Sequence, residues 1–226
     1  MNEIIRLLIE NIDAETRWAL REKTASAVLV GAEKSAYLRA AMRKADLLRI
    51  RIFTLADLQS CPRGLSELPV VADRDQDTFW GVRSEQDPDN LMPSHRGMSC
   101  VAEAVYLAMA GEGMLDPVDP VHVVLVGRGH AVKGLEERLL ARDATVTVCH
   151  SKTKNIGEIL KTANVVVYCA DTVSDEVFQS LCIKEPVVFD VSGAVAKAGR
   201  YVYASASDLG KLNVSILMNR IATGRR

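Results

Sequence analysis

The stretch VHVVLVGRGHAVKGLEERLLARDATVTVCHSKTK, residues 121–154, decides the fold. An apolar, strand-like run at 122–126 ends in Gly127-Arg128-Gly129, and a second strand at 145–149 is followed by His150-Ser151-Lys152. In a parallel sheet, phosphate-bearing ligands bind at the carboxyl ends of strands, where backbone N–H groups face the anion. The stretch therefore predicts a β-α-β unit of a dinucleotide-binding fold, with both polar motifs at the binding edge.

Strands and helices continue to alternate after this unit. Helical periodicity predicts a helix at 132–141, which connects the first two strands. The later pattern predicts a helix at 156–162, a strand at 165–169, a helix at 174–181, a strand at 186–190 and a last helix at 207–221. A further helix is predicted at 94–114, before a boundary at Pro117 and Pro120. Such alternation predicts a Rossmann-type parallel sheet with right-handed crossovers.

The N-terminal part repeats the alternation on a smaller scale. The apolar spacing predicts helices at 3–20 and 35–48 and strands at 27–30, 49–53 and 68–72, with a proline-rich, loop-like region at 58–93. We therefore expect an α/β protein of two domains. Its parts are a smaller, trimmed α/β N-terminal domain at 1–93, a dinucleotide domain at 94–206 and a C-terminal helix at 207–226 that packs back on the first domain.

Composition narrows the class of protein. The chain has 226 residues, 48% of them hydrophobic, and a net charge of −1, so it can bury a core but has no global field for nucleic acid or a membrane surface. Its five cysteines lack C-x-x-C or metal-ligand spacing and are typical of a reducing compartment. No signal-like or membrane-spanning run occurs. These features predict a soluble, cytoplasmic protein without a metal site, with an organelle as the alternative location.

The residues at the strand ends bear on the choice of cofactor. Gly127-x-Gly129 alone is weak evidence, because glycines after a strand are often only turn residues. An NAD-preferring site places an acidic residue at the end of the second strand, whereas this chain has His150-Ser151-Lys152 there. A hydroxyl and a cation, beside Arg128, suit a 2′-phosphate. The sequence therefore favours NADP.

Two longer runs carry a specific resemblance. Residues 124–132, VLVGRGHAV, and 144–153, ATVTVCHSKT, resemble V-V-G-R-S-x-I-V-G-x-P and A-T-V-T-x-C-H-S-[RK]-T of the bifunctional methylenetetrahydrofolate dehydrogenase/cyclohydrolase family. Other segments follow in the same order, namely 73–77 with D-K-D-V-D-G, 96–97 with P-R-G, 188–191 with V-I-D-V-G, and 210–217 with G-P-M-T-V-A-T-L. The resemblance covers nearly the whole chain, and its C-H-S-K-T element is the most diagnostic part.

The resemblance implies a set of cofactor-binding residues. Gly127 and Gly129 would let the chain turn under the pyrophosphate of NADP. The 2′-phosphate would be held by Arg128, Ser151 and Lys152. Val132 and His150 complete the predicted set.

The family's acid–base residues are only partly present. Its Y-V-x-x-K pairs a tyrosine with a lysine, and here Tyr37 is followed at the lysine position by Ala41. General acid–base assistance is commonly worth about 10²–10⁴-fold, so the cyclohydrolase step should suffer badly. Lys44, on the same helical face as Ala41, is either a displaced substitute or a solvated surface lysine.

Other positions of the folate side also depart from the family. Glu67 stands where Q-L-P-L-P has its glutamine. Asp77 corresponds to the aspartate that contacts the pterin, with an isolated surface carboxylate as the alternative, and Thr78 replaces the glycine that follows. Lys133 replaces a loop glycine, and residues 204–213 replace the P-G-G loop. The first domain is therefore expected to be trimmed around the folate cleft.

Three functions remain compatible with this pattern. The first is an NADP-dependent oxidoreductase of one-carbon metabolism, acting on methylenetetrahydrofolate through Tyr37 and Asp77, because hydride transfer needs fewer protein acids than hydrolysis. The second is a non-catalytic family member that keeps the fold and NADP binding as a binding or structural subunit. The third is an enzyme with another substrate in the remodelled cleft. A folate-type small molecule is the expected ligand, and the resemblance implies a homodimer through the cofactor domain.

Overall fold

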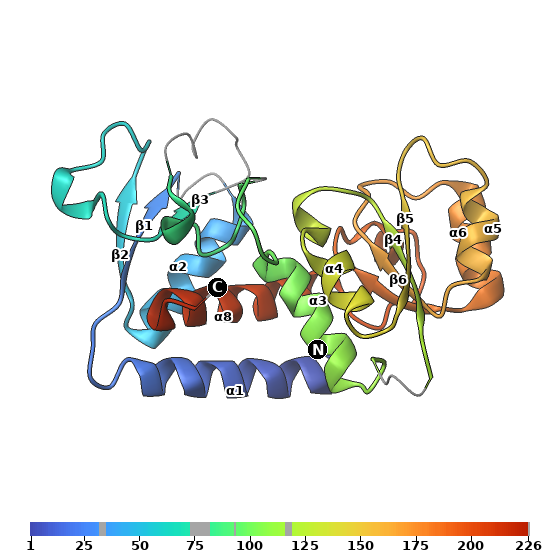
Figure 1. Cartoon of the computed structure of the whole chain (residues 1–226), viewed down its shortest axis with the longest axis horizontal. Helices are drawn as coiled ribbons and strands as arrows, with labels where there is room; N and C mark the ends of the chain where they lie inside the picture. The colour runs from blue at the N-terminus through green and yellow to red at the C-terminus, as the bar shows by residue number, and fades with distance from the viewer. Residues whose placement is uncertain (32–34, 73–81, 93, 116–118, 226) are drawn as a thin grey trace. The chain divides into compact units, whose positions relative to one another are not determined.

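The computed structural model of the chain describes residues 1–31, 35–72, 82–92, 94–115 and 119–225 (Figure 1). The chain divides into two compact units. Unit 1 contains Met1–Arg6 and Val101–Gly210, and unit 2 contains Leu7–Cys100 and Lys211–Arg226. Three helices, α1 (Glu3–Ala19), α3 (Cys100–Gly111) and α8 (Ala206–Thr223), contribute residues to both units. None of the described helices is long and apolar enough to cross a membrane.

Unit 1 is built on a parallel four-stranded sheet in the order β5-β4-β6-β7. The strands are β4 (His122–Val126), β5 (Thr145–Cys149), β6 (Val165–Tyr168) and β7 (Val187–Asp190). The connecting segments contain the 3₁₀ turn η4 (His130–Val132) and helices α4 (Leu135–Leu140), α5 (Ile156–Lys161), α6 (Asp175–Lys184) and α7 (Ala194–Lys197). This arrangement confirms the predicted parallel α/β fold.

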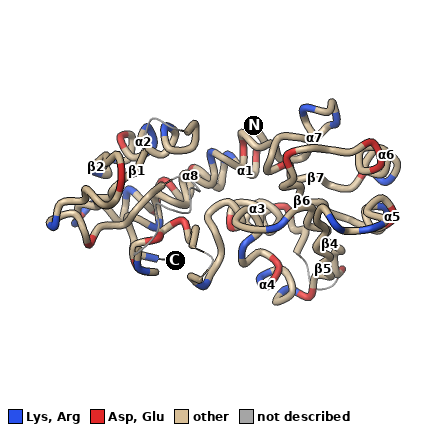
Figure 2. Tube along the Cα trace, turned by 90° about the horizontal axis from the view of Figure 1, so that it is seen from above, with Lys and Arg blue, Asp and Glu red and all other residues tan. Residues whose placement is uncertain are grey.

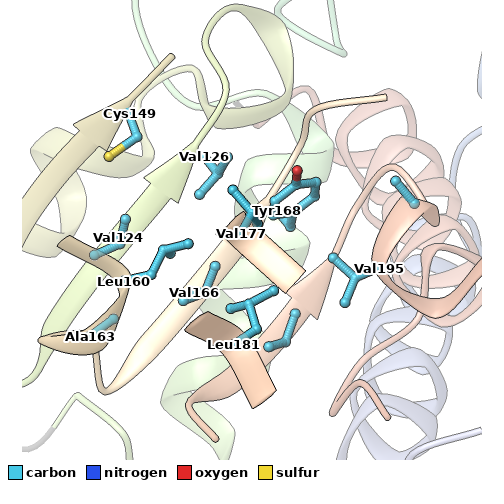
Figure 3. Packing of buried hydrophobic residues seen from close by; sticks show 12 residues of the cluster. Val124, Val126, Cys149, Leu160, Ala163, Val166, Tyr168, Val177, Leu181 and Val195 are labelled. Carbon is cyan, nitrogen blue, oxygen red and sulfur yellow. The ribbon is translucent and has the colours of Figure 1, made fainter. Parts of the chain in front are cut away.

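The sheet of unit 1 is buried on both faces. Val124 and Val126 of β4 point to one face, where they join a core that includes Leu160 of α5 and Leu181 of α6 (Figure 3). Leu125 lies between them in sequence and is only 1% exposed, although its side chain must point to the opposite face. Continuous runs of valine and leucine are expected in such a sheet because polar positions on either face would be buried without water.

Unit 2 contains a smaller parallel sheet with the strand order β2-β1-β3. Its strands are β1 (Ser26–Val30), β2 (Arg51–Leu55) and β3 (Val70–Ala72). Helix α2 (Ala36–Leu48) connects β1 to β2, and two 3₁₀ turns, η1 (Arg63–Leu65) and η3 (Ser84–Gln86), lie in the loops that follow. A β-α-β unit is therefore present in the N-terminal part as well.

Helix α2 is defined by its ends and by one buried stripe. The Ser35 hydroxyl accepts a hydrogen bond from the backbone N–H of Leu38 at 3.1 Å, which caps the first turn. The buried face consists of Leu38, Ala41, Ala45 and Leu48. Arg49 ends the helix in the left-handed region, with φ +61°. Tyr37 is thereby placed in the first turn of a well-anchored helix.

Several predicted boundaries differ from the structure, and three of the predicted starts differ for the same local reason. The helix predicted at 132–141 begins only at Leu135, because residues 130–132 form a 3₁₀ turn and Gly134 has φ +75°. The helix predicted at 94–114 begins at Cys100, after Gly97 with φ +106°. The strand predicted at 49–53 begins at Arg51, since the residue at 49 caps α2. In each case a backbone with positive φ interrupts the expected element.

Within unit 2, the end of α8 is tied to α1 and to the segment before α3. Asn219 donates a side-chain hydrogen bond to the hydroxyl of Thr16 at 3.2 Å. The buried Arg220 guanidinium donates to the carbonyl oxygens of Pro88 and Met98, both at 2.9 Å. These two carbonyls belong to the segment before α3, so the C-terminal helix fixes the loop that carries Asp89.

Candidate functional site

Three strands of unit 1 end at the same level. Val126 of β4 lies opposite both Cys149 of β5 and Tyr168 of β6. The residues that follow, Gly127 and His150, therefore lie along one edge of the sheet. Because β5 and β6 flank β4 on opposite sides, this edge contains the topological switch point of the sheet. Ligands of doubly wound proteins bind in the crevice at that point.

Gly127 is required by the close approach of two strand ends. Its N–H donates to the carbonyl of Cys149 at 2.8 Å, and its φ is +118°. A Cβ at this position would lie 3.1 Å from the Cβ of Cys169 and 3.3 Å from the carbonyl carbon of that residue. A side chain would thus meet backbone as well as strain. The glycine brings the turn after β4 against the end of β6.

The remainder of this turn presents backbone and cations to solvent. Gly129 has φ +94° and ψ −151°, a conformation essentially restricted to glycine, and nothing lies within 4 Å of the position of a Cβ. Arg128 is exposed, and Val132 is buried in the 3₁₀ turn. These residues, with Lys133, line a pocket of about 370 Å³.

The residues after β5 form a tight turn that uses His150 for its own backbone. The N–H of His150 donates to the Thr153 hydroxyl at 2.9 Å, and its ring Nδ1 accepts from the N–H of Lys152 at 3.1 Å. A neutral ring in this arrangement carries its proton on Nε2. The side chains of Ser151 and Lys152 are exposed at the strand-end edge. His150 therefore shapes the turn that presents the hydroxyl and the cation.

Unit 2 contains a buried carboxyl beside the predicted tyrosine. The phenolic hydroxyl of Tyr37 donates to Oδ2 of Asp89 at 2.5 Å. The N–H of Cys100 donates to Oδ1 at 3.3 Å. Burial raises the pKa of Asp89, and the hydrogen bonds from Tyr37 and Cys100 and the charge of Arg220 offset only part of that rise. The pair is a carboxyl and a phenol held in direct contact.

The segment around Asp89 is rigidly held. The buried Asp87 carboxylate accepts hydrogen bonds from the N–H groups of Leu91 at 2.9 Å and Met92 at 3.0 Å. Its Oδ2 also lies 2.8 Å from Nδ1 of His95. Asn90 adopts φ +55°, so the chain reverses directly after Asp89. These contacts fix the backbone segment that carries the Asp89 carboxyl.

The other predicted residues of the folate side lie elsewhere or have other partners. Ala41 is fully buried in α2. Lys44 forms an ion pair with Asp13 at 2.5 Å and is mostly buried, so it is not the solvated surface lysine of one sequence interpretation. Glu67 is exposed and forms an ion pair with Arg83. Asp77 lies outside the described residues. Among the described residues of this predicted set, Tyr37 is the one that contacts Asp89.

Asp89 is not among the residues that the sequence predicts for the site. Asp87-Pro88-Asp89-Asn90 repeats the D-x-D pattern of the family motif D-V-D-G, with a left-handed Asn90 where the motif has glycine. Residues 73–77 also contain this pattern. A turn-forming residue after the second aspartate is the signal that distinguishes the two. Among the described residues, no three His, Cys, Asp or Glu side chains gather as a metal site would require.

A parallel doubly wound sheet with a glycine turn at its switch point defines unit 1 as a dinucleotide-binding domain of the Rossmann class. The model of the tetrahydrofolate dehydrogenase/cyclohydrolase NAD(P)-binding domain matches residues 99–218, more than half of the 226 residues. The chain belongs to this family, and the predicted family membership is confirmed.

Individual relatives agree with the assignment. The chain is 26% identical to the bifunctional protein FolD of Cenarchaeum symbiosum over 72% of its own length and 63% of that protein. It is 32% identical to the FolD of Thermosipho melanesiensis, over 68% of this chain and 64% of that protein. The chain thus spans less than two thirds of the length of these relatives.

Solved structures share the fold across nearly the whole chain. The bifunctional methylenetetrahydrofolate dehydrogenase/cyclohydrolase of Thermoplasma acidophilum has a TM-score of 0.71 at 18% identity and covers 99% of this chain and 96% of its own. The corresponding Trypanosoma brucei enzyme, determined with NADP cofactor and an inhibitor, has a TM-score of 0.70 at 19% identity, with 100% and 96% covered. At these identities the likeness establishes the fold.

Proposed function

We propose that the chain is an NADP-dependent oxidoreductase of one-carbon metabolism that acts on methylenetetrahydrofolate. The observation that carries this proposal is the strand-end edge of unit 1, where Gly127 lets the turn pack against the end of β6 and Gly129 leaves open space for a pyrophosphate at the switch point. Arg128, Ser151 and Lys152 are exposed at the same edge. A hydroxyl and cations without an acidic residue after β5 suit a ribose 2′-phosphate and disfavour the unphosphorylated cofactor.

The residues present fit this cofactor. Open space at Gly129 allows the backbone to approach a phosphate closely, which any side chain would prevent. When bound, NADP supplies the hydride acceptor of the reaction. The chain would then need to hold the cofactor and orient the folate, which are positioning tasks.

On the folate side we propose that Tyr37 and Asp89 bind the pterin, with Asp89 in the role that the sequence gives to Asp77. A pterin offers ring nitrogens, an amino group and a carbonyl to such a pair. Because burial raises the pKa of Asp89, its carboxyl can keep its proton at a higher pH than an ordinary aspartic acid and can donate as well as accept.

The same geometry argues against cyclohydrolase activity. The residue one turn after Tyr37 is Ala41, whose methyl group can neither donate nor accept a proton. Lys44 lies a further turn along α2 and is engaged by Asp13. Glu67 is exposed and is engaged by Arg83. Neither Lys44 nor Glu67 therefore offers a substitute for the missing amine of the family.

A non-catalytic role is the second candidate. The observation that favours it concerns three residues of the folate side. Ala41 is buried by packing, and Lys44 and Glu67 are engaged in ion pairs with Asp13 and Arg83. In this case unit 1 would bind NADP without turnover, and the chain would act as a binding or structural subunit.

In either case we propose that the protein is a cytoplasmic homodimer that assembles through unit 1. Light scattering of the purified protein would test whether it is a dimer.

The deciding experiment is titration of the purified full chain with NADP, NAD and tetrahydrofolate, followed by assay of NADP reduction with methylenetetrahydrofolate. Binding of NADP and folate with turnover supports the dehydrogenase. NADP binding without folate binding supports the non-catalytic role. Asp89→Asn should lower turnover much more than NADP affinity, whereas Glu85→Gln, at an exposed residue of the 3₁₀ turn η3 in the same unit, serves as the matched control. Failure to bind NADP at all would overturn both candidates.

A further inference from the structure

The pocket of unit 1 has an apolar floor and a charged rim. Leu125 of β4 and Val148 of β5, which are neighbours in the sheet register, form part of its floor. Since Val124 and Val126 point into the core on the α5 and α6 side, Leu125 points to the other face of the sheet. The pocket therefore lies on that face, beside the 3₁₀ turn and α4, and its volume of about 370 Å³ is in the range of small-ligand sites.

Lys133 is fixed on the rim by the turn that precedes it. Its N–H donates to the carbonyl of His130 at 3.1 Å, which closes the 3₁₀ turn, and its side chain is half-buried. Its backbone has φ −58° and ψ +121°, which any residue can adopt. The family motif has glycine at this position, but the backbone of this chain does not require one. The lysine therefore adds a cation to the pocket without backbone strain.

The rim combines two cations with two carboxylates. Arg128 and Lys133 line the pocket, and so do Glu136 and Glu137 in the first turn of α4. Figure 2 shows basic and acidic residues next to one another along α4. A simple dianion would be repelled by the carboxylates, whereas a ligand with a phosphate at one end and hydroxyl or amino donors at the other satisfies both signs. Adenosine that carries a phosphate on its ribose has this pattern.

We propose that Lys133 is a specificity-determining residue that binds the phosphate on the adenosine ribose of NADP together with Arg128. This inference rests on the proposed cofactor of unit 1 and goes beyond it, because it assigns selectivity for the phosphorylated cofactor to a position where the family motif has no side chain. Glu136 and Glu137 then accept hydrogen bonds from the adenosine and oppose any ligand that brings charge alone.

The test compares Lys133→Met and Lys133→Gly with the unchanged chain by calorimetric titration. The ligands are NADP, NAD, adenosine 2′,5′-bisphosphate and adenosine 5′-monophosphate. Lys184→Met, which removes a lysine at the exposed end of α6, is the matched control. Both Lys133 variants should lose about tenfold in affinity for the two ligands with a 2′-phosphate, or about 1.4 kcal/mol. Their affinities for NAD and the monophosphate should stay within about twofold, and the loss should shrink as salt is raised.

A second variant tests the sign of the effect. Glu137→Gln removes a negative charge from the same rim but keeps an oxygen that can accept a hydrogen bond, so it should raise NADP affinity by about threefold. The inference is overturned if the Lys133 variants bind NADP as tightly as the unchanged chain, or if they lose NAD and NADP equally; the proposed function then still stands. An unchanged chain that binds no NADP would overturn the proposed function and this inference together. Thermal melting of each variant confirms that it is folded.

Discussion

The hydroxyl of Tyr37 and the carboxyl of Asp89 are 52 residues apart in sequence and share a 2.5 Å hydrogen bond. Their contact joins the first turn of α2 to the loop before α3. Ser35 caps that helix, and Arg220 holds the loop through the carbonyls of Pro88 and Met98. Two separate sets of backbone contacts therefore position the pair before any ligand binds, which is the arrangement that substrate orientation requires.

The raised pKa of Asp89 predicts a defined pH dependence of stability. Because the folded pKa lies above the ordinary value of 3.8, the folded chain binds this proton more tightly than the unfolded chain. Its contribution to stability is thus present below 3.8 and is lost as pH rises toward the folded pKa. Asp89→Asn should abolish this component. Urea unfolding from pH 4 to pH 7 should show a smaller decline for the variant, and parallel curves would contradict the prediction.

Removal of the tyrosine hydroxyl should raise the pKa of Asp89 further. The hydrogen bond from Tyr37 favours the charged carboxylate, so Tyr37→Phe removes an interaction that lowers the pKa. Carbon-13 NMR of the side-chain carboxyl measures the shift directly. Tyr201→Phe is the control, because that exposed ring belongs to unit 1. An unchanged or lower pKa in Tyr37→Phe would show that burial and the remaining partners alone determine the titration.

Even the conservative substitution Arg220→Lys should destabilise the protein. Its guanidinium donates to two different carbonyls at once, and a lysine ammonium on a single flexible stem does not reproduce that fork. Loss of one hydrogen bond from a charged group should cost about 2 kcal/mol. Because the charge of Arg220 lowers the pKa of Asp89, Arg220→Met should also raise that pKa, whereas Arg220→Lys should keep most of the charge effect. Denaturation and the NMR titration separate the two contributions.

The sequence predicts the strands of unit 1 well for a physical reason. The strands at 122–126 and 145–149 have the expected bounds because each apolar run is followed by a turn residue, Gly127 with φ +118° after the first and His150 after the second. Family membership also follows from these strand-end motifs, which are local in sequence. Helix starts are less predictable, since α4 begins after a 3₁₀ turn and Gly134, features that periodicity alone does not reveal.

The folate side is harder to predict because its contacts are not local. Two segments of the chain contain a D-x-D pattern, and only the fold reveals that Asp89 meets Tyr37. Likewise, the helical spacing of Lys44 allows a displaced amine, but its partner Asp13 lies on another helix, 31 residues earlier. Spacing along one helix therefore cannot distinguish a catalytic lysine from one held in an ion pair.

Lys44 should contribute to stability and not to catalysis. Its Nζ lies 2.5 Å from Oδ2 of Asp13, and Lys44→Met would leave a mostly buried carboxylate without this partner. Because both side chains keep some exposure, a loss of about 2 kcal/mol is expected, below the cost for a fully buried pair. The double variant Asp13→Asn/Lys44→Met should recover part of it. Dehydrogenase turnover of folded Lys44→Met should be unchanged, so a large loss of activity at full stability would restore the displaced-lysine hypothesis.

The two glycines of the strand-end turn should respond differently to alanine. At Gly127 a Cβ meets both strain at φ +118° and the backbone of Cys169, so Gly127→Ala should cost about 3 kcal/mol of stability. At Gly129 the space is open, and Gly129→Ala should cost about 2 kcal/mol through backbone strain alone. The second variant should nevertheless lose more NADP affinity than stability, because its methyl group occupies the space in which a phosphate approaches the backbone. Urea unfolding and NADP titration of both variants check this contrast. Equal losses of stability would mean that contact with Cys169 is not what makes a side chain unfavourable at position 127. Normal NADP affinity in Gly129→Ala would show that the pyrophosphate does not bind at this turn.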